Sequence, residues 1–277
     1  MRKTFYELLA DKKFDISEEY DKLIFLFAGE KCVGVDGYYN TIAAYIDRNY
    51  FRKLPNEIRG NSLNVSELMD SIELPLRSNK LEDIYLLCEF ISAVLSPTVV
   101  AERKVLSDQA ITIYRNINYI LEKTNHQFKM DKNGNQIVVS KNSTAILAAE
   151  IVADENISFD LIEYNHYALK GNLSEKKKIL SSIGLYIEPI LRDKTLKESN
   201  YGKLLSDTGF VFNNFHIRHN NCTGPKEQEY TKNLSNKDLE KWYDKAYDLA
   251  LAVIIAKECY STQNELNDLK KNYVWKT

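Results

Sequence analysis

Apolar residues recur at helical spacing along most of this chain. The first clear repeat follows Ser17-Glu18-Glu19, and its members are Tyr20, Leu23, Ile24 and Phe27. The same spacing predicts further helices over residues 41–51, 81–95, 107–121, 142–153 and 157–169. Pro97 is expected to end the helix over residues 81–95. The pattern therefore predicts a mainly α protein, built as a helical bundle.

Two more helices are predicted towards the end of the chain. One begins near Ser174, and Pro189 should kink or end it. The other is a long amphipathic helix that begins at Ser235, with Asp238 three residues on in a capping-box arrangement. The run Lys176-Lys177-Lys178 is typical of a solvated helix face.

One segment between the helices has the pattern of strands. Short runs with apolar residues, 127–130 and 136–139, flank a polar stretch that contains Asn133-Gly134. This dipeptide supplies the positive φ that a tight hairpin needs. We therefore predict a small β-hairpin near residues 127–139. It separates an N-terminal helical region, 1–125, from a second helical domain, 126–277, which has the hairpin inserted at its start.

Composition excludes several classes of protein. The chain has 277 residues and a formal net charge of −2, so no global positive field attracts nucleic acid and any RNA contact must be local. No apolar run of signal-peptide length stands near the start. The most apolar late stretch, 249–256, is far shorter than the roughly 20 residues that span a bilayer. We expect a cytoplasmic protein that does not enter a membrane.

Motifs for metal or cofactor chemistry are missing from the sequence. The four cysteines stand far apart without a CxxC pair, and we expect reduced, mostly buried thiols at Cys32, Cys88, Cys222 and Cys259. The sequence contains no Walker A loop, GxGxxG, GxSxG or HExxH. Its acidic residues show no clustering typical of metal ligands. We therefore expect no metal and no cofactor.

The densest polar cluster is the stretch FNNFHIRHNN, residues 212–221. If it is helical, Asn214, Arg218 and Asn221 fall at i, i+4 and i+7 and line one face, with His219 beside them. Such a face combines a permanent cation, a titratable imidazole and amides. Metal-independent RNA cleavage needs a base for the ribose 2′-OH, an acid for the leaving 5′-oxygen and a cation for the phosphorane.

This cluster and its surroundings resemble a known superfamily. The segment Ile217-Arg218-His219-Asn220-Asn221, followed by a loop with Gly224-Pro225 and a capped helix, is similar to the C-terminal part of HEPN (higher eukaryotes and prokaryotes nucleotide-binding) domains. Upstream, Tyr164-Asn165-His166, Leu169-Lys170-Gly171 and Glu188-Pro189 are similar to uncharacterised bacterial proteins allied to abortive-infection defence. The resemblance covers roughly residues 140–260.

The resemblance carries over unevenly to the catalytic motif. Ribonuclease members of the superfamily have an Arg, then a polar residue, and a His four to six residues after the Arg; two such motifs meet across a dimer. Arg218 matches this pattern. Cys222, Thr223 and Gly224 stand four to six residues after it, and the nearby imidazoles belong to His219 and His216.

The resemblance implies a metal-independent endoribonuclease in phage defence or toxicity. It implies a homodimer that acts on RNA, with an antitoxin or a phage-derived trigger as a further partner. Arg218 would hold the scissile phosphate, while His219 and His216 would serve as acid or base. The residues expected to bind or orient RNA are Asn214, Asn220, Asn221, His166 and Lys170.

Other functions stay open. The missing motif His favours a non-catalytic HEPN-like module that binds RNA, a nucleotide or a protein partner. A third hypothesis is a structural interaction protein whose N-terminal half recognises a phage component. The imidazoles have plain alternatives too: an Arg-His pair at a helix end can bind the last carbonyls, and His166 beside aromatic residues is typical of packing.

Overall fold

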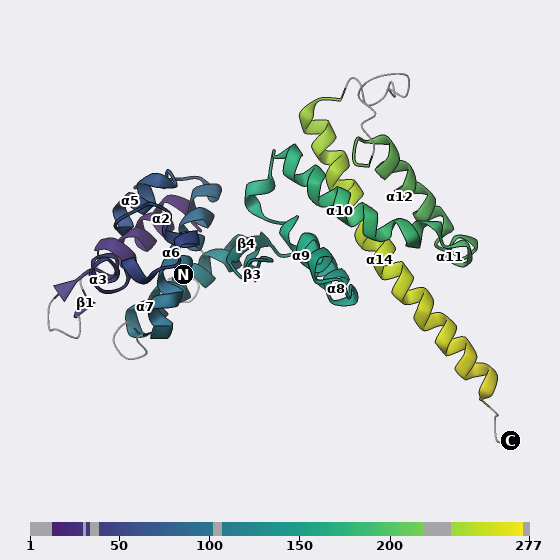
Figure 1. The fold of residues 1–277 in the computed structure, drawn as a ribbon, viewed down its shortest axis with the longest axis horizontal. Coiled ribbons are helices and arrows are strands. Elements are labelled where there is room, and N and C mark those ends of the chain that lie inside the picture. The colour runs from purple at the N-terminus through teal and green to yellow at the C-terminus, as the bar shows by residue number, and fades with distance from the viewer. Residues whose placement is uncertain (1–12, 30–31, 34–38, 102–106, 219–233, 274–277) are drawn as a thin grey trace, which may run out of the picture. The chain divides into compact units, whose positions relative to one another are not determined.

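The computed structural model describes residues 13–29, 32–33, 39–101, 107–218 and 234–273. Helices make up most of these ranges, together with two short antiparallel hairpins (Figure 1). The predicted mainly α fold with a small hairpin is confirmed. Within the described ranges, no helix combines the length and the apolar character that a bilayer crossing requires.

The chain divides into two compact units. The first comprises residues 1–130 and 134–140, and the second comprises 131–133 and 141–277. The hairpin of β3 (His126–Met130) and β4 (Gln136–Ser140) thus belongs mainly to the first unit, whereas the sequence placed it at the start of the second. The reason is packing: the Val138 amide donates to Glu89 Oε1 at 2.6 Å, and Tyr85 OH lies 3.1 Å from His126 Nδ1. Glu89 and Tyr85 both belong to the first unit.

The first unit is built on two helices, α6 (Leu81–Ala101) and α7 (Ser107–Lys123), against which the hairpin packs. The predicted stripe of the first helix is largely buried, and Phe27 meets Phe90 of α6 edge to face with ring centroids 5.8 Å apart. The described residues before α6 form α2 (Ile16–Ile24), η1 (Phe25–Gly29), β1 (Cys32–Val33), β2 (Tyr39–Asn40), α3 (Ile42–Asn49), η2 (Phe51–Lys53), α4 (Asn56–Arg59) and α5 (Val65–Ser71).

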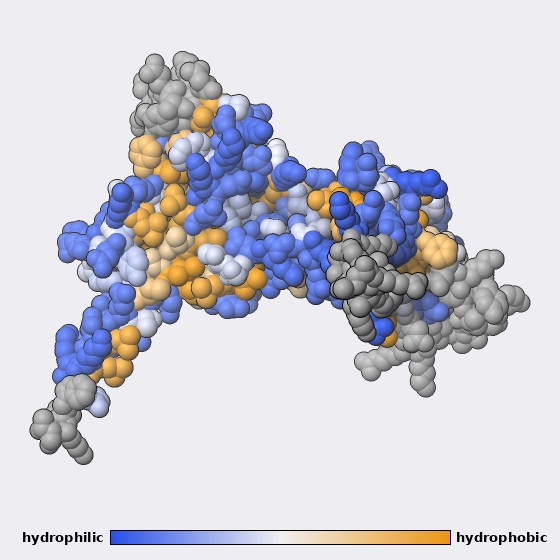
Figure 2. Space-filling view, turned by 180° about the vertical axis from the view of Figure 1, so that it is seen from behind, coloured by the Kyte–Doolittle hydropathy of each residue, from blue (hydrophilic) through white to orange (hydrophobic). Residues whose placement is uncertain are grey.

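The second unit is an all-helical bundle. Helices α10 (Leu173–Arg192) and α12 (Gly202–Asn214) both pack against α14 (Asn236–Asn272), while α8 (Ser143–Ile151) and α9 (Glu155–Glu163) pair beside them (Figure 1). The described residues of the unit also form two short helices, η3 (Tyr167–Leu169) and α11 (Lys194–Glu198). The last turns of α14 extend beyond its neighbours, and Figure 2 shows a largely hydrophilic surface there with an apolar strip on one side.

The cap at Ser235 is as predicted, but Asp15 caps the first helix, Asn172 caps α10, and neither Pro97 nor Pro189 ends its helix. Ser235 caps α14 by accepting from the Asp238 amide at 3.1 Å. Helix α6 runs through Pro97 to Ala101, and α10 runs through Pro189 to Arg192. Proline removes one backbone hydrogen bond. In α10 the buried Leu191 follows Pro189, and its burial helps to offset that cost.

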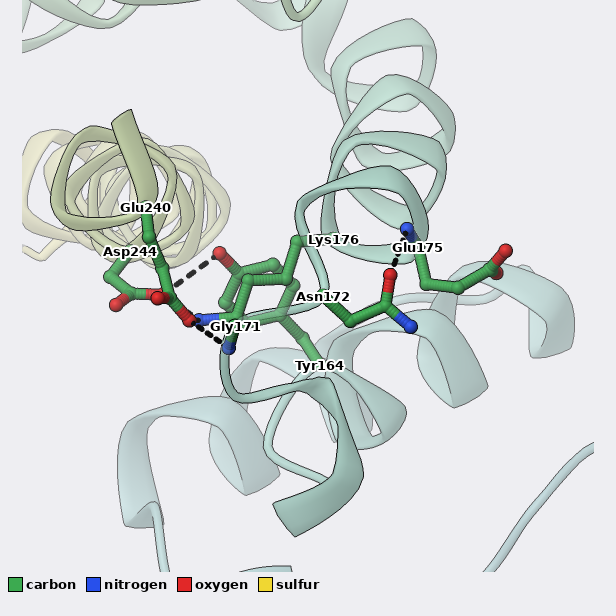
Figure 3. Close-up of polar contacts among 7 residues, drawn as sticks. All are labelled: Tyr164, Gly171, Asn172, Glu175, Lys176, Glu240 and Asp244. Carbon is green, nitrogen blue, oxygen red and sulfur yellow. Dashed lines mark hydrogen bonds and ion pairs between the residues drawn. The ribbon is translucent and has the colours of Figure 1, made fainter. Parts of the chain in front are cut away.

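A buried ammonium group ties α10 to α14 and to the loop after α9 (Figure 3). Lys176 Nζ lies 2.7 Å from Asp244 Oδ1 and 2.9 Å from Glu240 Oε1, and only 8% of its side chain is exposed. Tyr164 OH donates to the same Asp244 oxygen at 3.0 Å, and the Gly171 amide donates to Glu240 Oε1 at 2.7 Å. Asp244 Oδ1 and Glu240 Oε1 thus each accept from the ammonium group and from one further donor.

The predicted solvated face is wrong for Lys176 and right for Lys178. Lys176 lies three and four residues before the buried Ile179 and Leu180, so it falls on the face of α10 that packs against the core. Lys178 lies on the opposite side, with 74% of its side chain exposed.

Loss of the Lys176 ammonium should destabilise the fold strongly. The substitution Lys176→Ala leaves two carboxylates facing each other without a cation, and we expect the free energy of unfolding to fall by about 3–5 kcal/mol. The matched control Lys178→Ala should change it by less than about 0.5 kcal/mol. Urea unfolding of both variants measures the difference. An equal decrease in the free energy of unfolding for both would show that the buried ion pairs of Lys176 do not stabilise the fold more than the exposed Lys178 does.

The same network should lose its effect in acid. Burial raises the pKa of Glu240, but the Gly171 amide and Lys176 outweigh this, so the pKa lies below its ordinary value of 4.5. A lowered pKa gives stability that is present above the ordinary value and is lost as pH falls through the folded value. The stability difference between wild type and Glu240→Gln should therefore be constant near neutral pH and shrink below pH 4.5. Thermal unfolding across this range tests it; a difference that grows in acid would contradict it.

Candidate functional site

An open cavity of about 1050 Å³ lies between α10, α11, α12 and the turn that follows α12. Three of the side chains that line it are cations, one is a carboxylate and two are amides. They are Arg192, Lys197, Arg218, Glu188, Asn213 and Asn214. The charged groups sum to a local excess of positive charge in a chain whose net charge is −2. We call this space the Arg218 cavity.

The polar cluster that leads into the cavity is not one continuous helix. Helix α12 ends at Asn214, and His216 follows in the left-handed region at φ 62°. The turn closes when the Arg218 amide donates to Phe212 O at 3.2 Å. The prediction that Asn214 and Arg218 share a helix face is therefore wrong, although both line the same cavity.

Aromatic and apolar packing explains why the helix stops. The Phe215 ring stacks on Trp242 of α14, with centroids 4.3 Å apart and planes at 23°. Phe215 and Ile217 are both buried, at 5% and 2% exposure, and they stand two residues apart. A helix cannot point two such residues into one core, because it turns about 200° between them. Burial of both side chains therefore favours the turn.

The Arg218 guanidinium is held against α10. Its Nη2 donates to Gly184 O at 2.5 Å, and Nη2 also lies 3.9 Å from Glu188 Oε2. Carbon Cζ lies 5.8 Å from the centroid of the Phe212 ring. Burial lowers the pKa of Arg218, and Glu188 opposes this effect. Since an arginine stays protonated in proteins, the cavity keeps a permanent cation in a fixed place.

Gly184 makes this position accessible to Arg218. A Cβ at residue 184 would lie 2.9 Å from Phe212 Cδ1 and 3.5 Å from Arg218 Nε. Beside it on α10, Ser181 Oγ lies 2.9 Å from Ile217 O and so pins the turn. The middle of α10 thus fixes both the backbone of the turn and the side chain of Arg218.

His216 occupies a different environment from the one its predicted catalytic role needs. It is 6% exposed, and its Nδ1 has no hydrogen-bond partner among the described residues. The residues that line the cavity do not include it. Burial lowers the pKa of His216, and Lys177 lowers it further, so the imidazole is neutral near neutral pH. Its role as acid or base stays a prediction.

The other predicted site residues are distributed unevenly. Asn214 lines the cavity, and its Nδ2 donates to Phe210 O at 2.7 Å. His166 and Lys170 lie beside η3, outside the set of cavity-lining residues, and the His166 ring is 4.6 Å from Tyr167. The two ring planes are tilted by 45°, and this contact agrees with the packing role that the sequence left open. Three further predicted residues lie outside the described residues, namely His219, Asn220 and Asn221.

Sequence reasoning missed the part of the site that α10 and α11 provide. Ser181, Leu185, Glu188 and Arg192 line the cavity and stand at helical spacing, so they follow one face of α10. This spacing was a usable signal. Lys197 on α11 offered none, because its position depends on a tight connection in which a Cβ at Gly202 would meet Lys197 O at 2.1 Å.

The side chains that line the cavity offer cationic and amide groups. No three His, Cys, Asp or Glu side chains in the described part of the chain form a group that could hold a metal ion. Comparisons with protein-family models, with curated proteins and with solved structures found no match for this chain. The arrangement that remains can bind an anion by charge and by amide hydrogen bonds.

The close packing around Gly184 can be tested by comparing two glycine-to-alanine substitutions, one at Gly184 and one at Gly209. Gly184→Ala should lower the free energy of unfolding by about 1–3 kcal/mol, because the added methyl group overpacks against the Phe212 ring. Gly209→Ala lies in α12, where an added Cβ meets nothing within 4 Å. It should leave stability unchanged or raise it by about 0.5–1 kcal/mol. Chemical denaturation compares the two, and a neutral Gly184→Ala would contradict the close approach.

Proposed function

We propose that the second unit is a metal-independent endoribonuclease of the HEPN type that acts in phage defence or toxicity in the cytoplasm. RNA is its substrate, and a second copy of the chain and an antitoxin or phage-derived trigger are its proposed partners. The observation that carries the proposal is the fixed guanidinium of Arg218 in a cavity that also holds Arg192 and Lys197. A phosphodiester is the anion that best matches several such cations.

The proposed reaction uses groups of the protein and the RNA alone. A base takes the proton of the ribose 2′-OH, the 2′-oxygen attacks phosphorus, and the bond to the 5′-oxygen breaks as that oxygen takes a proton. Arg218 stabilises the charge that builds on the phosphorane. Asn214 orients the strand through its amide, and His219 serves as acid or base. The products are a 2′,3′-cyclic phosphate and a free 5′-OH.

A second function rests on the same cavity. The burial of His216 and its place outside the cavity lining favour a binding module that holds RNA without cutting it. In that function Arg218 still binds phosphate, and the amides still contact the strand. The two functions therefore share the binding step and differ only in turnover.

Removal of the Arg218 side chain should abolish RNA cleavage, if the unit is a nuclease, and weaken RNA binding under either function. We expect wild-type protein incubated with total bacterial RNA in EDTA to produce fragments with cyclic phosphate ends, and Arg218→Ala to produce none. On a labelled single-stranded RNA, Arg218→Ala should weaken binding and reduce the salt slope by about one phosphate contact. The matched control is Arg115→Ala, which removes an exposed arginine of α7 in the first unit.

Three outcomes separate the alternatives. Cleavage by wild type and Arg115→Ala, but not by Arg218→Ala, supports the nuclease. Binding that depends on Arg218, without fragments, supports the binding module. Cleavage that persists in Arg218→Ala rules out both roles for this cavity.

A further inference from the structure

The end of α14 projects from the core of the second unit. The helix spans Asn236–Asn272, 37 residues, which is about 55 Å at the rise of an α-helix. Its buried positions end at Ala256, and from Lys257 onward the described side chains are exposed apart from the partly buried Tyr260. The lower end of α14 in Figure 1 thus lacks neighbouring helices of its own unit. About four turns of helix stand in solvent.

This projecting end carries an apolar stripe. Leu266 and Leu269 are 47% and 67% exposed and stand three residues apart. Cys259 and Thr262 continue the same spacing towards the core. These four residues of the helix, which we call the α14 stripe, occupy the a and d positions of a heptad repeat. The strip on one side of the helix in Figure 2 agrees with this spacing.

Such a stripe has an energetic cost when it stands alone. A helical segment of about 12–15 residues is marginal in water unless an apolar face is covered. Here Leu266 and Leu269 expose much of their side chains to solvent, and no described side chain from Lys257 onward is buried, so little packing offsets the entropy of ordering the segment. A partner that covers the α14 stripe would stabilise the helix and bury these side chains together.

The charges beside the stripe favour a second copy of the same segment. With Leu266 at an a position, Glu265 falls at g and Lys270 at the following e. In a parallel pair, Glu265 of each helix faces Lys270 of the other, so both contacts are attractive. In an antiparallel pair, Glu265 would face Glu265 and Lys270 would face Lys270. The pattern thus fits one orientation and disfavours the other.

We propose that the α14 stripe pairs with the same stripe of a second chain as a short parallel coiled coil. The second unit of one chain and the second unit of its partner then lie at the same end of a two-fold axis that runs along the paired helices. None of the residues from 257 to 273 lines the Arg218 cavity, so the inference does not rest on the proposed nuclease.

Sedimentation equilibrium of the full chain over a range of concentrations tests the pairing. Wild type should show twice the mass of one chain, and Leu266→Glu combined with Leu269→Glu should shift it to the mass of one chain. The matched control places two glutamates off the stripe, at Asn264 and Asn267, and should stay dimeric. Circular dichroism should show that the second unit stays folded in both variants, because all four positions are exposed.

A charge exchange tests the orientation. Glu265→Lys alone and Lys270→Glu alone should each weaken the dimer, since each places like charges across both contacts. The double exchange should restore wild-type association, because it reverses every pair. A monomeric wild type, a dimer that survives the stripe glutamates, or a double exchange weaker than either single variant overturns the proposal.

Discussion

The ammonium of Lys176, enclosed by the carboxylates of Glu240 and Asp244, fixes where α10 lies on α14. Charges are costly to bury, so the pairing tolerates little displacement of either helix. The Tyr164 hydroxyl and the Gly171 amide donate to the same two carboxylate oxygens and add the loop after α9 to the same point. Every feature of the Arg218 cavity that depends on α10 therefore depends on this contact at the start of that helix.

Helix α10 connects the Lys176 ion pairs to the Arg218 cavity. Lys176 holds its first turn, Ser181 binds the turn after α12, and Gly184 receives Arg218 in the middle of the helix. Phe215 connects the same turn to Trp242 on α14. The turn is thus held between the two helices whose relative position Lys176 sets. The orientation of the guanidinium follows from packing within one rigid frame rather than from its own short loop.

The parts of the fold that could be predicted from sequence are those that local chemistry decides. The caps at Ser235 and Asn142, and the hairpin at Asn133-Gly134, depend on residues within three positions of each other. Long-range packing decides the rest. Helix α10 continues past Pro189 with the buried Leu191, and the hairpin joined the first unit because the Val138 amide donates to Glu89.

The candidate site shows the same division. Arg218 and Asn214 could be selected from their chemistry and from the resemblance, and both line one cavity. Their shared helix face could not be predicted correctly, since Phe215 and Ile217 end the helix by packing on a surface far away in sequence.

Gly184 also has a consequence for how such a protein would be studied by systematic substitution. It contributes no functional group, yet nearly any side chain there displaces Phe212 and, with it, the arginine of the cavity. A scan of all positions would score residue 184 with the reactive residues, although it contacts the site only through a backbone carbonyl. In such a scan, substitutions that fill the space beside the guanidinium at residue 184 would therefore reduce function as clearly as substitutions that remove the charge of Arg218.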